Sequence, residues 1–94
     1  MSLVDLRREV QRIDEEIIWL IAERVGLAEK IFEIKKAEGI KIEDPDQETL
    51  VMNRVLDLAT ELNVDAGAIK EIIHLLIKMS LDKQHECLGE DNLP

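Results

Sequence analysis

Apolar residues recur every three or four positions over residues 3–38. This spacing puts them on one side of a helix and predicts a single α-helix from about Leu3 to Glu38, which Gly39 ends as a C-terminal cap. The apolar stripe, here called the seam, consists of Leu3, Leu6, Val10, Ile13, Ile17, Leu20, Leu27, Ile31 and Ile34. Arg24 holds the seam position between Leu20 and Leu27, so a charged side chain interrupts the hydrophobic stripe.

Two shorter helical patterns follow. Asp44, Pro45 and Gln47 form a helix start, with an N-cap, a proline in the first helical position and a capping-box partner. Asp65 caps a third helix after a break at residues 63–65. The apolar stripes of these two helices are Val51, Val55, Leu58 and Leu62, and then Ile69, Ile72, Ile73, Leu76 and Ile77. Strand-like alternation is missing from the sequence, so the predicted fold class is all-α with three helices.

The three helices differ in length, and this difference predicts a second copy of the chain. The first helix is roughly 54 Å long and the third about 30 Å. A hairpin of the second and third helices covers little more than half of the first, so the remaining seam needs another partner. We therefore expect an intertwined homodimer with antiparallel long helices. Residues 1–94 form one predicted domain, with a helical core over 3–88 and a disordered tail over 89–94.

Composition and charge narrow the classes of partner. The formal net charge of -9 argues against a nucleic-acid partner, because phosphate binding requires a basic face. The longest apolar run, residues 17–22, is too short to cross a membrane. The single cysteine, Cys87, fits a reducing cytoplasm and predicts a cytoplasmic protein. Eight of the twelve Lys and Arg residues precede residue 42, so the first helix must supply most of the positive charge for any anion site.

Arg24 and Lys35 are the first pair of candidate binding residues. They are eleven positions apart, so both project from nearly the same helix face, about 16 Å apart. A guanidinium is well suited to bidentate recognition of a carboxylate. The alternative for Arg24 is an internal ion pair with Glu23, Glu29 or an acid of a partner chain.

Two polar pairs occupy corresponding places on the other helices. Ser80 and Gln84 continue the inward stripe of the third helix, although a frayed end facing solvent would also explain them. Asp44 and Glu48 share one face at the start of the second helix, where capping and the helix dipole are sufficient explanations. Taken together with the two cations, these pairs predict a pocket for a small molecule that carries carboxylates and a hydroxyl.

Nucleophilic and metal chemistry are poorly supported by the sequence. Ser80 has no histidine on its helix face, since His74 lies roughly 120° away around the helix. His85 and Cys87 are two positions apart and point in different directions, so a zinc site is not expected. The predicted pocket therefore works by electrostatic catalysis or by binding alone, without a cofactor.

The motifs and their order resemble the all-helical class of chorismate mutase. The resemblance covers residues 3 to 86 and is carried by "LRREVQRIDEEI", "LIAERVGLAEKI", the lysine in "EIKKAEG", "DPDQE" and "SLDKQ". It implies an intertwined dimer with two active sites, each using residues of both chains. It also implies the Claisen rearrangement of chorismate to prephenate, on the route to phenylalanine and tyrosine. This pericyclic reaction requires no metal or cofactor.

The resemblance also implies a role for each candidate residue. Arg24 matches an arginine that binds a substrate carboxylate, and Ser80 matches a further carboxylate contact. Arg7 matches a second carboxylate-binding arginine, which reaches the site from the other subunit. Lys35 and Gln84 match the two groups that contact the ether oxygen, and Lys35 also contacts a carboxylate.

The start of the second helix both follows the family pattern and departs from it. Glu48 matches the acid that holds the ring hydroxyl, and Asp44 lies beside it. Many relatives have an arginine where this chain has Gln47, so one positive charge near the bound carboxylates is missing.

Two other functions fit parts of the pattern. One is an isochorismate pyruvate lyase on the same fold, but its substrate has the ring hydroxyl elsewhere, so Glu48 favours the mutase. The other is a non-catalytic helical dimer that acts as a regulatory module. That function does not explain why Ser80 and Gln84 lie on an inward face.

Overall fold

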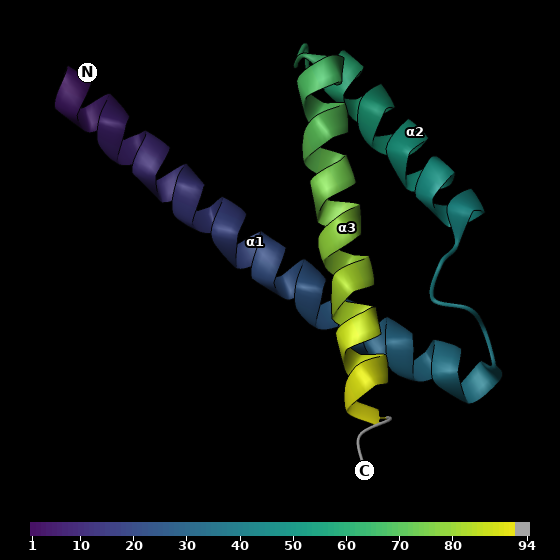
Figure 1. The fold of residues 1–94 in the computed structure, drawn as a ribbon. Helices are drawn as coiled ribbons and strands as arrows, with labels where there is room; N and C mark the ends of the chain where they lie inside the picture. Colours follow the sequence, from purple (N-terminus) through teal and green to yellow (C-terminus); the bar gives the residue numbers. More distant parts are fainter. Residues whose placement is uncertain (92–94) are drawn as a thin grey trace.

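The computed structural model of the chain describes residues 1–91. It contains three α-helices: α1 (Leu3–Glu38), α2 (Pro45–Glu61) and α3 (Ala66–Asp91) (Figure 1). The prediction of an all-α fold with one long helix is confirmed. None of the described helices combines the length and apolarity needed to cross a membrane.

Local capping interactions set the ends of α1. Ser2 is the N-cap, and its side-chain oxygen accepts a hydrogen bond from the Asp5 backbone N–H at 3.2 Å. The Ser2 hydroxyl and backbone N–H in turn donate to the Asp5 carboxylate, and these hydrogen bonds lower the pKa of Asp5. At the other end Gly39 adopts a left-handed φ of 69°, which glycine reaches without a steric penalty.

The starts of α2 and α3 are also stabilised by side-chain caps. The Asp44 side chain accepts a hydrogen bond from the Gln47 backbone N–H at 3.2 Å, and Pro45 occupies the first helical position. Asp65 accepts from the Ala68 N–H at 3.0 Å, after a turn in which Asn63 has a φ of 61°. The third helix continues through Gly89 to Asp91, further than the predicted core. Residues 92–94 of the predicted tail lie outside the described residues.

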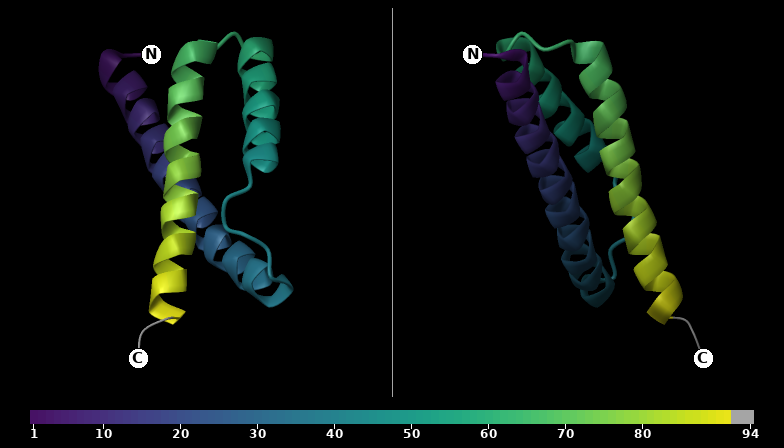
Figure 2. Two further views of the ribbon diagram at one scale, coloured as in Figure 1. Left: turned by 45° about the vertical axis from the view of Figure 1, so that its right-hand side comes forward. Right: turned by 90° about the vertical axis from the view of Figure 1, so that its left-hand side faces the viewer.

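α3 is the central helix of the chain. It packs against both α1 and α2, whereas α1 and α2 do not contact each other within residues 1–91. In Figures 1 and 2, α2 runs antiparallel beside the first half of α3, and the second half of α3 crosses the C-terminal part of α1. The N-terminal half of α1 extends away from both, and the molecule is 57 Å in its longest dimension.

The face of α1 that packs within the chain is not the seam. Ala28 and Phe32 are buried, with exposed fractions of 1% and 4%, and Ile21 and Val25 are half-buried beside them. The seam residues stay exposed along the whole helix, including Leu20 at 62% and Leu27, Ile31 and Ile34 at 47–59%. The expectation that the hairpin covers about half of the seam is therefore wrong. The small Ala28 side chain allows α3 to approach the neighbouring face instead.

The inward stripe of α3 also differs from the prediction at one position. Ile69, Ile73, Leu76 and Ile77 are half-buried, but Ile72 is 51% exposed. Adjacent helical residues point about 100° apart, so Ile72 is turned away from the side that Ile73 presents to the other helices.

Candidate active site

A pocket of about 320 Å³ lies between the three helices and the link that joins α1 to α2. Arg24, Ile31 and Lys35 line it from α1. Val51 lines it from α2, and Ile77 and Leu81 line it from α3. The remaining lining residues are Ile42, Asp44, Gln47, Glu48, Ser80 and Gln84. Six of the seven residues that the sequence predicted for the site thus converge on one cavity.

Arg24 enters the pocket from the border between the two faces of α1. Its Nη1 atom donates to the backbone oxygen of Leu76 at 2.8 Å and to Ser80 Oγ at 2.7 Å. Both acceptors are neutral, so within the described chain the internal ion pair considered above does not form. The contacts hold the guanidinium against α3 and leave its charge uncompensated, as a carboxylate-binding arginine requires.

Lys35 projects into the same pocket from α1, three turns further along. Its Nζ atom donates to the backbone oxygen of Ile42 at 2.6 Å, and Ile42 is 8% exposed. An ammonium has three protons, so this contact leaves two of them for a ligand. The carbonyl partner orients the ammonium without neutralising its charge.

Gln84 is the most deeply placed polar residue of the pocket. It is only 4% exposed, and its Oε1 atom is buried with no hydrogen-bond partner among the described residues. A buried amide with unused hydrogen-bonding capacity is costly unless a ligand or water completes it. This burial also removes the possibility that Ser80 and Gln84 belong to a frayed, solvent-facing helix end, because α3 continues beyond both.

The start of α2 supplies the acidic side of the pocket. Asp44 and Glu48 are half-buried, and both line the cavity. Asp44 is also the N-cap of α2, so its carboxylate both stabilises the start of the helix and lines the pocket. Gln47 lines the pocket too, and its backbone N–H rather than its side chain completes the cap. Gln47, the position at which the sequence is expected to depart from the family pattern, is therefore an exposed residue of the pocket wall.

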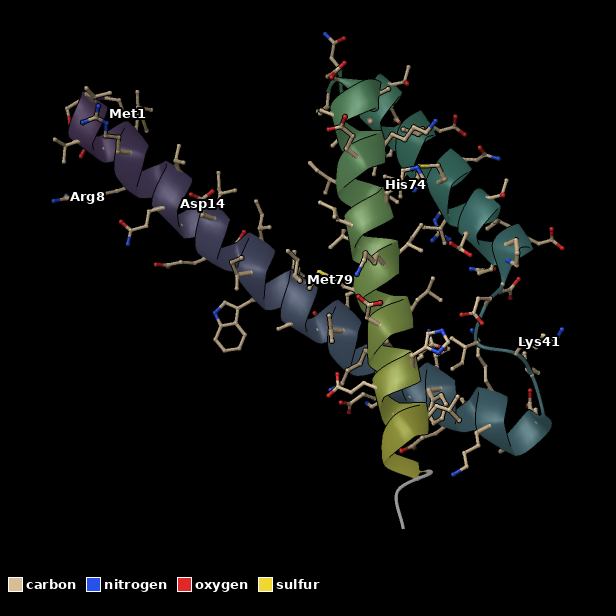
Figure 3. The ribbon with its side chains drawn as sticks, viewed as in Figure 1. Met1, Arg8, Asp14, Lys41, His74 and Met79 are labelled. Carbon is tan, nitrogen blue, oxygen red and sulfur yellow. The ribbon has the colours of Figure 1, made fainter. Side chains whose placement is uncertain are left out.

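Arg7 does not reach this pocket. It is exposed in the second turn of α1, and the distance along the helix to Arg24 is roughly 26 Å. The neighbouring Arg8 points away from the rest of the chain (Figure 3). A single chain therefore brings two cations and two carboxylates to the pocket, a formal sum of zero.

One interaction beside the pocket has no counterpart in the sequence-based prediction. Glu43 of the link contacts His85 of α3, and this hydrogen bond is the main reason why the pKa of Glu43 lies below its usual value. The two residues are 42 positions apart, so no local pattern indicates the contact. No group of three or more His, Cys, Asp or Glu residues within the described part of the chain could hold a metal ion.

The helices and the pocket define an all-helical protein with a charged cavity for a small molecule between its helices. Residues 6–85 match the family described as chorismate mutase type II. The chain belongs to this family, and the sequence-based prediction of a chorismate mutase is confirmed.

Individual relatives agree with the family match. A chorismate mutase from Methanocaldococcus jannaschii is 38% identical over 89 residues, which are 95% of this chain and 90% of the relative. A bifunctional chorismate mutase/prephenate dehydratase from Aquifex aeolicus is 36% identical over 79% of this chain but only 20% of its own length. The corresponding Escherichia coli protein is 29% identical over 94% of this chain and 23% of its own length. The chain thus spans about a fifth of these bifunctional relatives.

Proposed function

We propose that the pocket catalyses the Claisen rearrangement of chorismate to prephenate. The observation that carries this proposal is the convergence of Arg24, Lys35, Glu48, Ser80 and Gln84 on one cavity from three helices. The reaction is an isomerisation in which the ether C–O bond breaks and a C–C bond forms within one molecule. It therefore requires a shaped, charged cavity rather than a nucleophile or a base.

Each pocket residue has a role that follows from its chemistry. Arg24, held by Ser80 and the Leu76 carbonyl, binds one substrate carboxylate and fixes the compact conformer from which the bonds reorganise. Negative charge develops on the ether oxygen as the C–O bond breaks. Lys35 and Gln84 donate to that oxygen and so stabilise the transition state more than the ground state. Glu48 accepts a hydrogen bond from the ring hydroxyl, with Asp44 beside it.

The charge of the pocket supports a contribution from a second chain. Chorismate is a dianion, whereas Arg24 and Lys35 are matched in number by Asp44 and Glu48. A further cation is needed, and Arg7 lies on the part of α1 that extends beyond the chain's own core. We place the exposed seam in an antiparallel contact between two long helices, which brings Arg7 of one protomer to the pocket of its partner.

The decisive experiment is loss of chorismate absorbance on mixing with purified protein. Lys35→Ala should lower kcat by at least about 10², because the ether oxygen loses its charged donor. Lys30→Ala, an exposed lysine of the same helix, should leave the rate unchanged. Wild-type rates in Lys35→Ala would remove this residue from the site. Pyruvate release from isochorismate, with no turnover of chorismate, would identify the lyase instead.

A further inference from the structure

The link between α1 and α2 forms part of the pocket wall. Ile42 and Asp44 both line the cavity, and the Ile42 carbonyl accepts the hydrogen bond from Lys35 Nζ. Lysine has a long, flexible side chain with several rotatable bonds. The position of its ammonium is therefore fixed only when its hydrogen-bond acceptor is fixed. The position of the Lys35 charge therefore depends on the position of the link backbone at Ile42.

The link is anchored at Ile42, which is 8% exposed, but the backbones of α1 and α2 on either side of it do not approach each other closely within residues 1–91. One interaction that ties the link to α3 is the pair formed by Glu43 and His85. Glu43 directly follows Ile42, and His85 directly follows Gln84. The pair thus connects the link, whose Ile42 carbonyl holds Lys35, to the part of α3 that carries Gln84. Lys35 and Gln84 are the two proposed donors to the ether oxygen.

The residues around Glu43 and His85 are consistent with a contact that holds the link against α3. A second cavity of about 270 Å³ lies on this side of the link, and Lys35, Lys36, Lys41, Glu43 and His85 all line it. Glu43 is the single carboxylate among these lining residues, beside three lysines. The Lys35 charge also contributes to the lowered pKa of Glu43, after the larger effects of the hydrogen bonds.

We propose that the Glu43–His85 pair is a positioning device for catalysis: it clamps the link to α3, so that the Ile42 carbonyl holds the Lys35 ammonium at the reacting ether oxygen. Neither Glu43 nor His85 touches the substrate in this arrangement. The inference rests on the proposed function of Lys35. Its consequence is that two exposed residues outside the family's binding motifs control kcat.

The first test is kinetic. His85→Ala and Glu43→Ala should each lower kcat by about tenfold with less than a twofold change in KM, because misplacing a transition-state donor spares ground-state binding. The double variant should be no slower than either single variant, since both remove one contact. Lys78→Ala, which breaks an exposed ion pair with Asp82 elsewhere on α3, is the matched control and should keep the wild-type kcat.

Combination with Lys35→Ala separates positioning from general damage to the fold. If the clamp acts through the lysine, adding His85→Ala to Lys35→Ala should lower kcat by less than about twofold more. An undiminished tenfold loss in that background would overturn the proposal, because the pair would then act through another group. A wild-type kcat in His85→Ala would overturn it as well.

The second test does not depend on activity. Lys41 lies on the outer side of the link (Figure 3), so trypsin can cleave the bond after it whenever the link opens. His85→Ala leaves the sequence around that bond unchanged, and it should raise the rate of cleavage after Lys41 by about tenfold over wild type. An unchanged cleavage rate would show that the link needs no clamp. Failure of the wild-type protein to consume chorismate would instead reject the proposed function, whatever the cleavage rates are.

Discussion

Arg24 lies at the boundary between a packed face and an exposed face of α1. It lies between the face of α1 that packs on α3 and the exposed seam, and its guanidinium reaches Ser80 and the Leu76 carbonyl. A half-buried cation without a carboxylate partner costs free energy in the empty protein. In the proposed function that cost is recovered when a substrate carboxylate binds. The proposal thus explains the charge in the apolar stripe by a ligand rather than by folding.

Gln47 is the residue at which substitution should improve the site. Its side chain faces the pocket, and the cap of α2 uses only its backbone N–H. Gln47→Arg should therefore leave the melting temperature unchanged and lower KM by about fivefold, a gain on the order of 1 kcal/mol from the added positive charge. Thr60→Arg adds the same charge at the far end of α2 and should have no effect. An unchanged KM in Gln47→Arg would mean that the position does not face a bound carboxylate.

The proposed role of Gln84 predicts the pH dependence of the rate. An amide donates without being protonated, so kcat should be nearly flat from roughly pH 6 to 8. Gln84→Glu should behave differently, because a carboxyl must be protonated to donate, and its rate should rise toward acid. A tenfold rise per pH unit in the wild-type protein would contradict the role of Gln84.

The Glu43–His85 pair should stay formed across this pH range. The pKa of Glu43 is lowered in the folded chain, chiefly by its hydrogen bond with His85. The stabilisation from the pair is therefore complete above the ordinary pKa of about 4.5. It is lost only as the pH falls through the lowered value. The plateau in kcat thus lies within the range where Glu43 is ionised.

At the scale of the elements, α1 has two apolar faces with different tasks. Ala28 and Phe32 belong to the face that packs on α3, and the seam belongs to the face that remains uncovered. An exposed stripe that runs along a whole helix is unusual for a monomer and typical of an interface. The length of α1 therefore supports the proposed contact with a second chain.

A charge in the seam should separate the two chains. Ile17 is 48% exposed, so Ile17→Glu leaves the intrachain packing intact but places an unpaired carboxylate in the proposed interface. Sedimentation equilibrium should show a dimer for the wild-type protein and a monomer with little activity for Ile17→Glu. Arg8→Gln, which changes the net charge by the same single unit on the opposite side of α1, should remain a dimer. A dimeric Ile17→Glu protein would place the interface elsewhere.

At the scale of the whole molecule, the incomplete charge of the pocket predicts a site shared between chains. Arg7→Ala and Arg24→Ala should each nearly abolish activity as homodimers. When the two variants are unfolded and refolded together, random association gives about half heterodimers. In each heterodimer both substitutions fall in one site, and the other site is wild type. Activity should recover to roughly a quarter of the wild-type value.

The control for this experiment is each variant refolded alone, which should stay inactive. Heterodimers are counted by native mass spectrometry. A mixture that contains them but shows no recovered activity would mean that Arg7 and Arg24 serve the same chain.

The sequence by itself determined the helices and predicted most of the polar residues that line the pocket. Gly39, Asp44 and Asp65 mark helix ends because a cap involves groups only three or four residues apart, so the relevant interactions are local. The family motifs then identified Arg24, Lys35, Glu48, Ser80 and Gln84, which the fold brings to one pocket. Arg7 stays a prediction, since it lies on the part of α1 beyond this chain's own core.

Only the tertiary structure decided how the helices meet. Two apolar stripes on α1 are both suitable for packing, and the structure shows that the one with Ala28 and Phe32 is buried. The hydrogen bond from Arg24 to Ser80 spans 56 positions, and the Glu43–His85 contact spans 42. No local pattern encodes such pairs, because they form only after distant elements pack together. The same packing determines that a backbone carbonyl, at Ile42, holds the Lys35 ammonium.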